Sequence, residues 1–445
     1  MLPMTPVATP LRRFFDALRE SPPLVWSFLY FFFLLSGYYV LRPVREAMGA
    51  SADVAQVFPP AMIAFFAQRG IALGEFTLQV LFTCTFLIML LLQPAYGALV
   101  SRYPRRVFLP VVYGFFIVTL LVFYAMFDSG MPGRGMAFFL WIAVFNLFAV
   151  AVFWSFMADI FSDVEARAWY GYIGAAGTIG AFCGPIITRM LVERVGIPNL
   201  MLVAASLLGM CVVCQVRLRR WAVQREIQRG KKDGEKPLGG TVWAGLTLVA
   251  REPLLRWMAV LMVCGVGVGT LLYNAQAGIV RAQYPDPQDA TAFYANIDLA
   301  INALTLIVQL FVTRWLLSRF GIAPALLIPA AAVFLGYCLL AASPLPILVA
   351  VVQILTRSGE FCLHKPARET VYTQVPREWR YKAGAAIDTV IYRGGDLVFG
   401  WAYKAISVLG ATAVFGTGAL IALGFGFSSF KLWREQQKLP TKRGL

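Results

Sequence analysis

The chain has 445 residues, of which 59% are hydrophobic and only 14% are charged. Its mean hydropathy is +0.69, whereas about a quarter of the residues of an ordinary soluble domain are charged. This composition excludes a soluble globular protein. Twelve membrane spans of about 20 to 25 residues would occupy roughly 240 to 300 positions. We therefore expect an all-α membrane protein with twelve transmembrane helices.

Long apolar runs bounded by proline, glycine and charged residues predict two sets of six helices. The first set is placed at residues 24–46, 74–100, 107–127, 136–160, 168–190 and 198–216. The second set is placed at residues 254–281, 290–317, 322–341, 345–366, 384–407 and 411–432. The predicted domains are an N-terminal six-helix bundle (1–216), a basic cytoplasmic linker (217–253) and a C-terminal six-helix bundle with a cytoplasmic tail (254–445). Short helices are expected near residues 53–67 and over 241–252.

The net charge of +16 would suggest a nucleic-acid partner in a soluble protein. Here most of the basic residues lie in loops between apolar runs, and nearly all of them fall on one side if the N-terminus is cytoplasmic. The other side holds Arg69, Arg134 and Arg194. The positive-inside rule then places both termini in the cytoplasm. We expect the linker to contact anionic lipids, no nucleic acid to bind, and the monomer to be the working state.

Charged side chains inside the spans are the strongest indication of function, because each costs roughly 2.5 to 3.5 kcal/mol at a helix centre unless it faces water or a partner. Arg42 and Arg45 lie three residues apart at the outer end of the first helix, just after Tyr38 and Tyr39. The arginines could bind a phosphate or carboxylate while the tyrosines stack on a ring. Alternatively, the arginines extend to the outer membrane interface as anchors.

Charged residues also lie within the spans of the second half, at Asp298, Arg357, Glu360, His364, Lys365, Asp388, Arg393 and Asp396. Glu360 stands one helical turn from both Arg357 and His364, the only histidine of the chain. Two interpretations remain open. The set is either a structural network of ion pairs or a pathway for substrate or protons.

Two local patterns resemble the major facilitator superfamily. The first is the spacing GxLxDRxGRR of its loop between helices 2 and 3, reproduced by Gly97, Leu99, Ser101, Arg102, Pro104, Arg105 and Arg106. Ser101 replaces the Asp and Pro104 the Gly, so the charge relay between the two halves is either weakened or formed by other residues. The second is the run of glycines from Gly171 to Gly184, followed by Pro185. These glycines predict close approach of a neighbouring helix, a kink that helps the halves rock, or both.

Three stretches are similar to the ATP/ADP translocases of plastids and intracellular bacteria, which share that architecture. They are Leu41–Glu46, Phe153–Tyr170 and Pro366–Gly395, with a weaker match at Arg281–Pro285. The resemblance implies a substrate path containing Arg42, Arg45, Glu165, Arg167, Arg281, Asp388 and Arg393. The chain departs from the nucleotide exchangers at Tyr273, Ala277 and Ile279, where they carry an acidic residue and lysines. This departure removes charge from the expected polyphosphate route and indicates a divergent relative in a bacterial inner membrane.

We predict a secondary transporter of an organic anion, such as a nucleotide or another phosphorylated metabolite, in which two bundles rock about a central site. The predicted substrate-binding residues are Tyr38, Tyr39, Arg42, Arg45, Arg281, Arg357 and Arg393. The predicted coupling or gating residues are Asp298, Glu360, His364, Asp388, Glu165 and Arg167. The alternative is a proton-coupled importer or exporter of an amphiphile, such as a siderophore, peptide or drug. We expect no enzymatic activity, cofactor or metal site, because no catalytic or metal-ligand spacing is visible.

Overall fold

A computed structural model of the chain describes residues 21–102, 105–161, 163–229, 242–375, 383–384 and 386–438. Among these residues the regular structure is helical throughout, and none of them forms a strand. Ten helices of this described part are long and apolar enough to cross a membrane. These findings confirm the predicted all-α membrane fold and are consistent with twelve spans.

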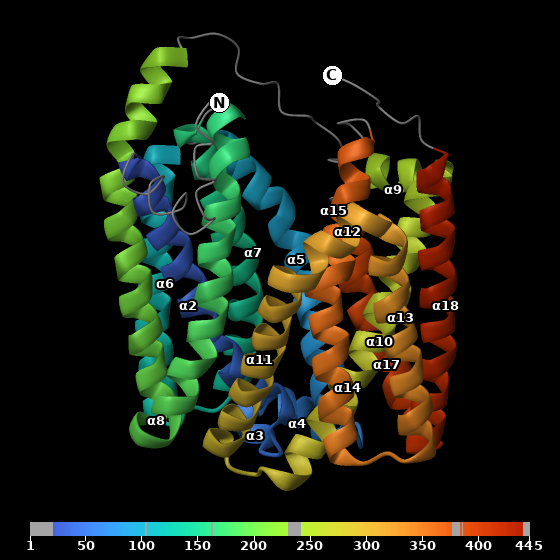
Figure 1. The fold of residues 1–445 in the computed structure, drawn as a ribbon. Helices are drawn as coiled ribbons and strands as arrows, with labels where there is room; N and C mark the ends of the chain where they lie inside the picture. Colours follow the sequence, from blue (N-terminus) through green and yellow to red (C-terminus); the bar gives the residue numbers. More distant parts are fainter. Residues whose placement is uncertain are drawn as a thin grey trace. The chain divides into compact units, whose positions relative to one another are not determined.

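The helices of the first part of the chain follow the predicted runs (Figure 1). They are α2 (Pro22–Ala50), α3 (Val54–Val57), α4 (Pro60–Ala67), the 3-10 turn η1 (Leu73–Phe76), α5 (Thr77–Arg102), α6 (Arg105–Asp128), α7 (Arg134–Ile160) and α8 (Asp163–Arg229). The predicted short helix near residues 53–67 is confirmed by α3 and α4. Asp53 begins α3, because its carboxylate accepts hydrogen bonds from the backbone N–H groups of Ala55 and Gln56 at 3.0 and 3.2 Å.

The second part begins with α9 (Val242–Arg251), which confirms the short helix expected over residues 241–252. The remaining α-helices are α10 (Pro253–Gln283), α11 (Pro287–Val308), α12 (Arg314–Phe320), α13 (Ile322–Ala342), α14 (Pro346–Gly359), α15 (Lys365–Gln374), α17 (Tyr392–Ser407) and α18 (Ala411–Gln437). Three π-helical turns, η2 (Gln309–Thr313), η3 (Glu360–His364) and η4 (Ile387–Ile391), continue into neighbouring α-helices. The π turns were not predicted.

The long helix α8 contains two of the predicted spans. Gly196 interrupts it with φ 78° and ψ 167°, a backbone conformation that glycine adopts without a steric penalty. Pro198 follows and has the fixed φ that suits a helix start. The break therefore separates the predicted helices 168–190 and 198–216, although the helical segment as a whole reaches Arg229.

The contacts of the chain group it into two compact units. The first unit contains Met1–Arg45 and Met89–Gly234, and the second contains Glu46–Ile88 and Glu235–Leu445. The segment Glu46–Ile88 belongs to the second unit because its side chains bond to α10 and α17. The amide of Gln79 donates to Asn274 Oδ1 at 3.2 Å and to the carbonyl of Gly400 at 3.1 Å. The domain boundaries expected at residues 216 and 254 divide the chain into six predicted helices on each side of the linker. They stay a prediction.

Replacing Gln79 with leucine should destabilise the second unit. The substitution leaves the buried acceptors of Asn274 and Gly400 without their donor, and each lost bond of this kind costs about 1 to 3 kcal/mol. We expect a lower thermal unfolding temperature of the purified protein. Gln68→Leu is the matched control, since Gln68 is exposed. Equal unfolding temperatures for the two variants would contradict the importance of this junction.

The first unit packs α2 directly against α8. A methyl group at Gly180 would lie 2.5 Å from the carbonyl oxygen of Phe32, and one at Gly184 would lie 2.5 Å from Cβ of Tyr39. The backbones of the two helices therefore approach too closely for any side chain at these glycines. This confirms the close approach predicted from the glycine pattern.

The second unit is built around α10, α13 and α18, which lie side by side in Figure 1. The ring of Tyr337 on α13 occupies the space above Gly418 of α18, and its hydroxyl donates to the carbonyl of Val268 on α10. Apolar side chains of the three helices, among them Leu271, Val333 and Ala422, form one buried cluster. The helices α14, α15 and α17 and the turn η3, which carry the polar residues described below, pack around these three helices.

Candidate functional site

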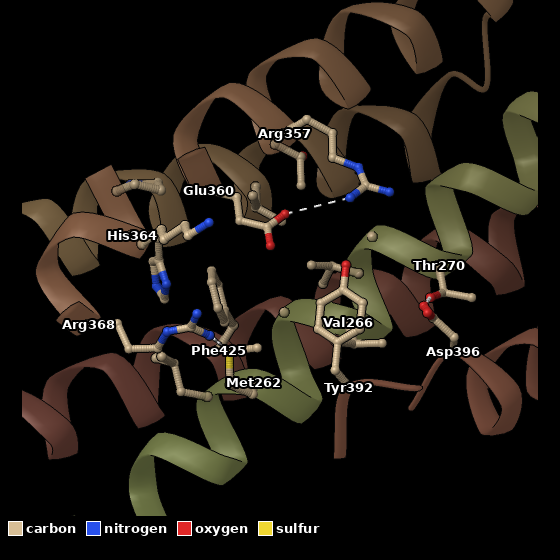
Figure 2. A pocket seen from close by; sticks show the side chains of 18 residues that line it. Met262, Val266, Thr270, Arg357, Glu360, His364, Arg368, Tyr392, Asp396 and Phe425 are labelled. Carbon is tan, nitrogen blue, oxygen red and sulfur yellow. Dashed lines mark hydrogen bonds and ion pairs between the residues drawn. The ribbon is translucent and has the colours of Figure 1, made fainter. Parts of the chain in front are cut away.

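A cavity lies within the second unit, and the space free of protein atoms in it, including the solvent at its opening, is about 740 Å³. Its walls come from α10, α13, α14, η3, α15, α17 and α18, and Figure 2 shows it from close by. The polar residues that line it are Thr270, Thr356, Arg357, Glu360, His364, Lys365, Arg368, Tyr392 and Asp396.

One continuous helix, α14 through η3 to α15, supplies most of the charge. Arg357, Glu360, His364 and Arg368 stand on successive turns, and Figure 2 shows Glu360, His364 and Arg368 pointing into the same space. Arg357 Nη1 lies 3.8 Å from Glu360 Oε2, as the predicted spacing of one turn requires. This ion pair is loose, and the Glu360 side chain is 40% exposed. The pair is therefore expected to contribute little to stability.

Arg368 lies deep in the cavity wall. Its side chain is 11% exposed, and its guanidinium donates to the sulfur of Met262 at 2.6 Å. Glu369 lies 3.9 Å from the same guanidinium but is itself 58% exposed. A thioether is a weak and uncharged acceptor. The arginine thus brings a positive charge into a largely desolvated place.

Helix α17 contributes an acidic residue that is held from two sides. Asp396 accepts a hydrogen bond from Thr270 of α10 at 3.0 Å, and Arg393 Nη1 lies 3.5 Å from its other carboxylate oxygen. Arg393 also lies over the ring of Tyr392, 5.5 Å from its centre. The predicted residue Arg393 therefore acts on the cavity wall through Asp396. The predicted role of Arg393 in substrate binding stays a prediction.

Two buried polar groups of the cavity wall have no hydrogen-bond partner in the described part of the chain. They are Nε2 of His364 and Oγ1 of Thr356, on side chains that are 6% and 9% exposed. The imidazole ring of His364 stacks on Phe425, with 4.7 Å between the ring centres. Buried polar groups nearly always have a partner. These two atoms therefore mark places where a ligand or water would bind.

Sequence reasoning brought Arg357, Glu360 and His364 together correctly but did not assign Arg368, Thr270 or Thr356 to a site. The predicted helix ended at residue 366, which left Arg368 in a cytoplasmic loop. In the structure α15 continues to Gln374. The spacing of four residues between His364 and Arg368 was the available signal.

The predicted site residues of the first unit lie on α2, α7 and α8. Arg45 stacks over the ring of Phe139, 4.2 Å from its centre, and Arg42 lies 5.5 Å from the ring centre of Tyr39. Tyr38 packs edge-on against Tyr39. Glu165 is half-buried at the start of α8. The side chain of Arg167, on the same helix, lies outside the described part of the structure.

The remaining predicted residues belong to the second unit. Arg281 donates to the carbonyls of Ala50 and Gly74 at 3.3 and 2.8 Å, so it ties the end of α10 to the segment Glu46–Ile88. Asp298 is buried on α11, with 4% of its surface exposed. Asp388 stands in η4, and its side chain is outside the described part. The structure does not bring Arg281 or Asp298 into the wall of the cavity.

The family is decided by the extent of one sequence match. The family model of the Major Facilitator Superfamily matches residues 56–398, which is more than half of the chain. The chain belongs to the major facilitator superfamily. It is accordingly a multi-pass membrane transporter, as the spans of both units indicate.

Relatives of this major facilitator protein confirm the expected similarity to ATP/ADP translocases. It is 23% identical to the ADP,ATP carrier protein 1 of Chlamydia trachomatis over 316 residues, 61% of this chain and 59% of that protein. It is 25% identical to the chloroplastic ADP,ATP carrier protein 1 of Arabidopsis thaliana over 271 residues, 54% of this chain and 43% of that protein. The match thus spans about half the length of these relatives.

Solved structures of major facilitator type share the fold. A POT family transporter crystallised with 5-aminolevulinic acid has a TM-score of 0.61 at 12% identity, covering 94% of this chain and 96% of that one. The nucleoside transporter NupG has a TM-score of 0.54 at 14% identity, covering 94% and 98%. The relatives and these structures are transporters rather than enzymes. At such low identity the structural likeness shows the fold alone.

Proposed function

We propose that the protein is a secondary active transporter of an organic anion, with a nucleotide or another phosphorylated metabolite as substrate, and that it works by alternating access. The observation that carries this proposal is the cavity of the second unit. It combines the basic residues Arg357, Lys365 and Arg368 with the unpartnered groups of His364 and Thr356. Guanidinium and ammonium groups are the usual protein ligands of phosphate and carboxylate.

The balance of charge in the cavity favours an anion. Glu360 lies beside Arg357, and Asp396 is held by Thr270 and Arg393. Both carboxylates of the wall therefore have a cation or donor close by. The lining carries three basic side chains, Arg357, Lys365 and Arg368, against these two carboxylates, and this excess of positive charge supports binding of a negative group.

The names of the relatives support a nucleotide within this class, since they are carriers of ADP and ATP. In α10, Tyr273 and Ala277 are buried where nucleotide exchangers carry charge. A polyphosphate would therefore meet fewer fixed charges along α10 here. This difference extends the proposed substrate class to other phosphorylated metabolites.

A proton-coupled transporter of an amphiphile is the second candidate. Buried Asp298 on α11 and Glu360 in the cavity favour it, because carboxyl groups of this kind carry protons in transporters. For either candidate we propose a bacterial inner membrane, cytoplasmic termini and a monomer, with the basic linker on anionic lipids. The distribution of Lys and Arg along the sequence supports this orientation.

Counterflow of labelled ATP and ADP in proteoliposomes tests the function. We expect exchange by the wild-type protein and a loss of roughly tenfold or more in Arg42→Ala and in Arg45→Ala, because a hydrogen bond to a charged group contributes about 1.5 to 3 kcal/mol. Arg69→Ala is the control, since Arg69 is exposed and bonds to the carbonyl of Phe65.

Unchanged exchange in both α2 variants would make Arg42 and Arg45 membrane anchors. A wild-type protein that exchanges neither nucleotides nor a panel of other phosphorylated metabolites would overturn the anion proposal. If such a protein instead took up a peptide or siderophore in response to an acid jump, the second candidate would replace the first.

A further inference from the structure

Two of the π turns of the second unit lie against each other. The side chain of Gln309 in η2 donates to the carbonyl of Phe361 in η3 at 3.2 Å. The hydroxyl of Thr313, also in η2, donates to the carbonyl of Cys362 at 2.7 Å, and this bond is buried. Donors on α11–η2 thus bond directly to the backbone of the turn that carries Glu360 and His364.

A π turn holds one residue more than the α-helix around it, and such turns are rare and concentrate at functional sites. In η3 the N–H of Lys365 donates to the carbonyl of Glu360, five residues back. The wider turn leaves its carbonyls open to donors from outside the helix. Gln309 and Thr313 supply such donors.

The same junction continues one turn toward the start of α14. Ser358 donates to the carbonyl of Ile301 on α11 at 3.2 Å, and Ile301 packs with Ala350 and Phe361. The two helices are therefore held in register above η3 as well. On its other side η3 presents Glu360 and His364 to the cavity, as Figure 2 shows.

The extra residue of η3 sets the rotation of everything that follows it. Each residue of an α-helix turns the chain by about 100°. If η3 closed to a regular α-helix, His364 and Arg368 would rotate by roughly that angle relative to Arg357. The cavity would then lose the arrangement in which residues before and after the turn face the same space.

We propose that Gln309 and Thr313 are positioning residues of the transport site. By holding η3 in its π form, they direct His364, Lys365 and Arg368 into the space that Arg357 and Glu360 line, and thereby determine the affinity of the cavity for the transported anion. The part of this proposal that concerns the affinity for an anion rests on the proposed function. The geometric part of the proposal is independent of it.

Cysteine labelling tests the geometric part without any ligand. Lys365 follows η3, lines the cavity and is exposed. It is replaced by cysteine in a Cys362→Ala background, so that modification at position 365 is unambiguous, and its reaction with a water-soluble maleimide is followed by peptide mass spectrometry. We expect the labelling rate at position 365 to fall about tenfold when Gln309→Leu and Thr313→Val are added, because closing η3 rotates this position away from the cavity. Thr313→Ser keeps the hydroxyl and should retain the original rate.

Thr305→Val is the matched control. Thr305 is a buried threonine of α11 whose hydroxyl has no hydrogen-bond partner among the described residues, so its substitution should leave the labelling rate unchanged. If the double variant does not fold, the single variants decide, because each removes one bond and should give a smaller decrease. Equal rates in Thr313→Val, Gln309→Leu and the control would overturn the proposal.

Binding of ATP, measured by thermal stabilisation with lysine retained at position 365, is the second readout. We expect Thr313→Val to weaken the apparent affinity about tenfold and Thr313→Ser to restore it. Failure of ATP and other phosphorylated metabolites to bind the wild-type protein would count against the proposed function, and the labelling result would still decide the role of Gln309 and Thr313. Reduced labelling with unchanged ATP affinity would overturn the link between η3 and the ligand.

Discussion

Arg368→Gln should weaken the binding of ATP or another phosphorylated ligand by about 10- to 100-fold. The guanidinium is nearly buried, and its described hydrogen bond goes to an uncharged sulfur. An anion in the cavity would gain one or two charge-assisted bonds from it, each worth about 1.5 to 3 kcal/mol. Every 1.4 kcal/mol corresponds to about a tenfold change in affinity. The dissociation constant is measured by ligand-dependent thermal stabilisation.

Two further variants separate binding from folding. Arg368→Lys keeps the charge but lacks the planar fork, so we expect an intermediate loss. Arg319→Gln removes an exposed arginine of α12 and should bind like the wild type. The unfolding temperature of the ligand-free Arg368→Gln protein is measured alongside, so that a loss of affinity is separated from a loss of stability. Full affinity in Arg368→Gln would exclude this arginine from the site.

Gly184→Ala and Gly180→Ala should each destabilise the first unit. A methyl group at Gly184 would lie 2.9 Å from the carbonyl of Ser36, and one at Gly180 would meet the carbonyl of Phe32. These neighbours are backbone atoms of α2, so no side-chain rotation relieves the overlap. Overpacking of this kind costs about 1 to 3 kcal/mol. We expect the thermal unfolding temperature to fall by several degrees for each change and by more for both.

The same helix contains two glycines whose replacement by alanine should not lower the unfolding temperature. A methyl group at Gly171 or Gly174 would meet no atom within 4 Å, and alanine favours a helix over glycine by about 1 kcal/mol. Gly171→Ala and Gly174→Ala should therefore unfold at or above the wild-type temperature. If all four alanine variants unfolded alike, the close approach of α2 and α8 would not limit stability.

These four glycines have different surroundings, although the spacing pattern in the sequence is the same for all of them. Glycines at spacings of three and four predict a helix face that another helix can approach. The pattern identified the correct helix, yet the four positions carry the same residue and differ only in what stands opposite. Gly180 and Gly184 face the backbone of α2, whereas Gly171 and Gly174 face open space.

Arg368 illustrates a second limit of the pattern. Lys365, Arg368 and Glu369 lower the hydropathy after residue 364, and the predicted span ended at residue 366. The helix nevertheless continues to Gln374, with Ala367 and Val371 completely buried. Tertiary packing on one face of α15 compensates for the charges on the other, and hydropathy averaged over all faces does not separate the two.

The order and approximate positions of the helices follow from the amino-acid order alone. In a membrane each span must be apolar and must satisfy its backbone hydrogen bonds within itself, so both requirements are local and can be read from a single stretch of chain. The rotation of the helices was decided by the tertiary structure. The π turns, the bonds of Gln309 and Thr313 to η3, and the pairing of Gln79 with α10 and α17 join residues far apart in the chain. These contacts determine which charged side chains share a cavity, because the direction of a side chain depends on what its helix packs against.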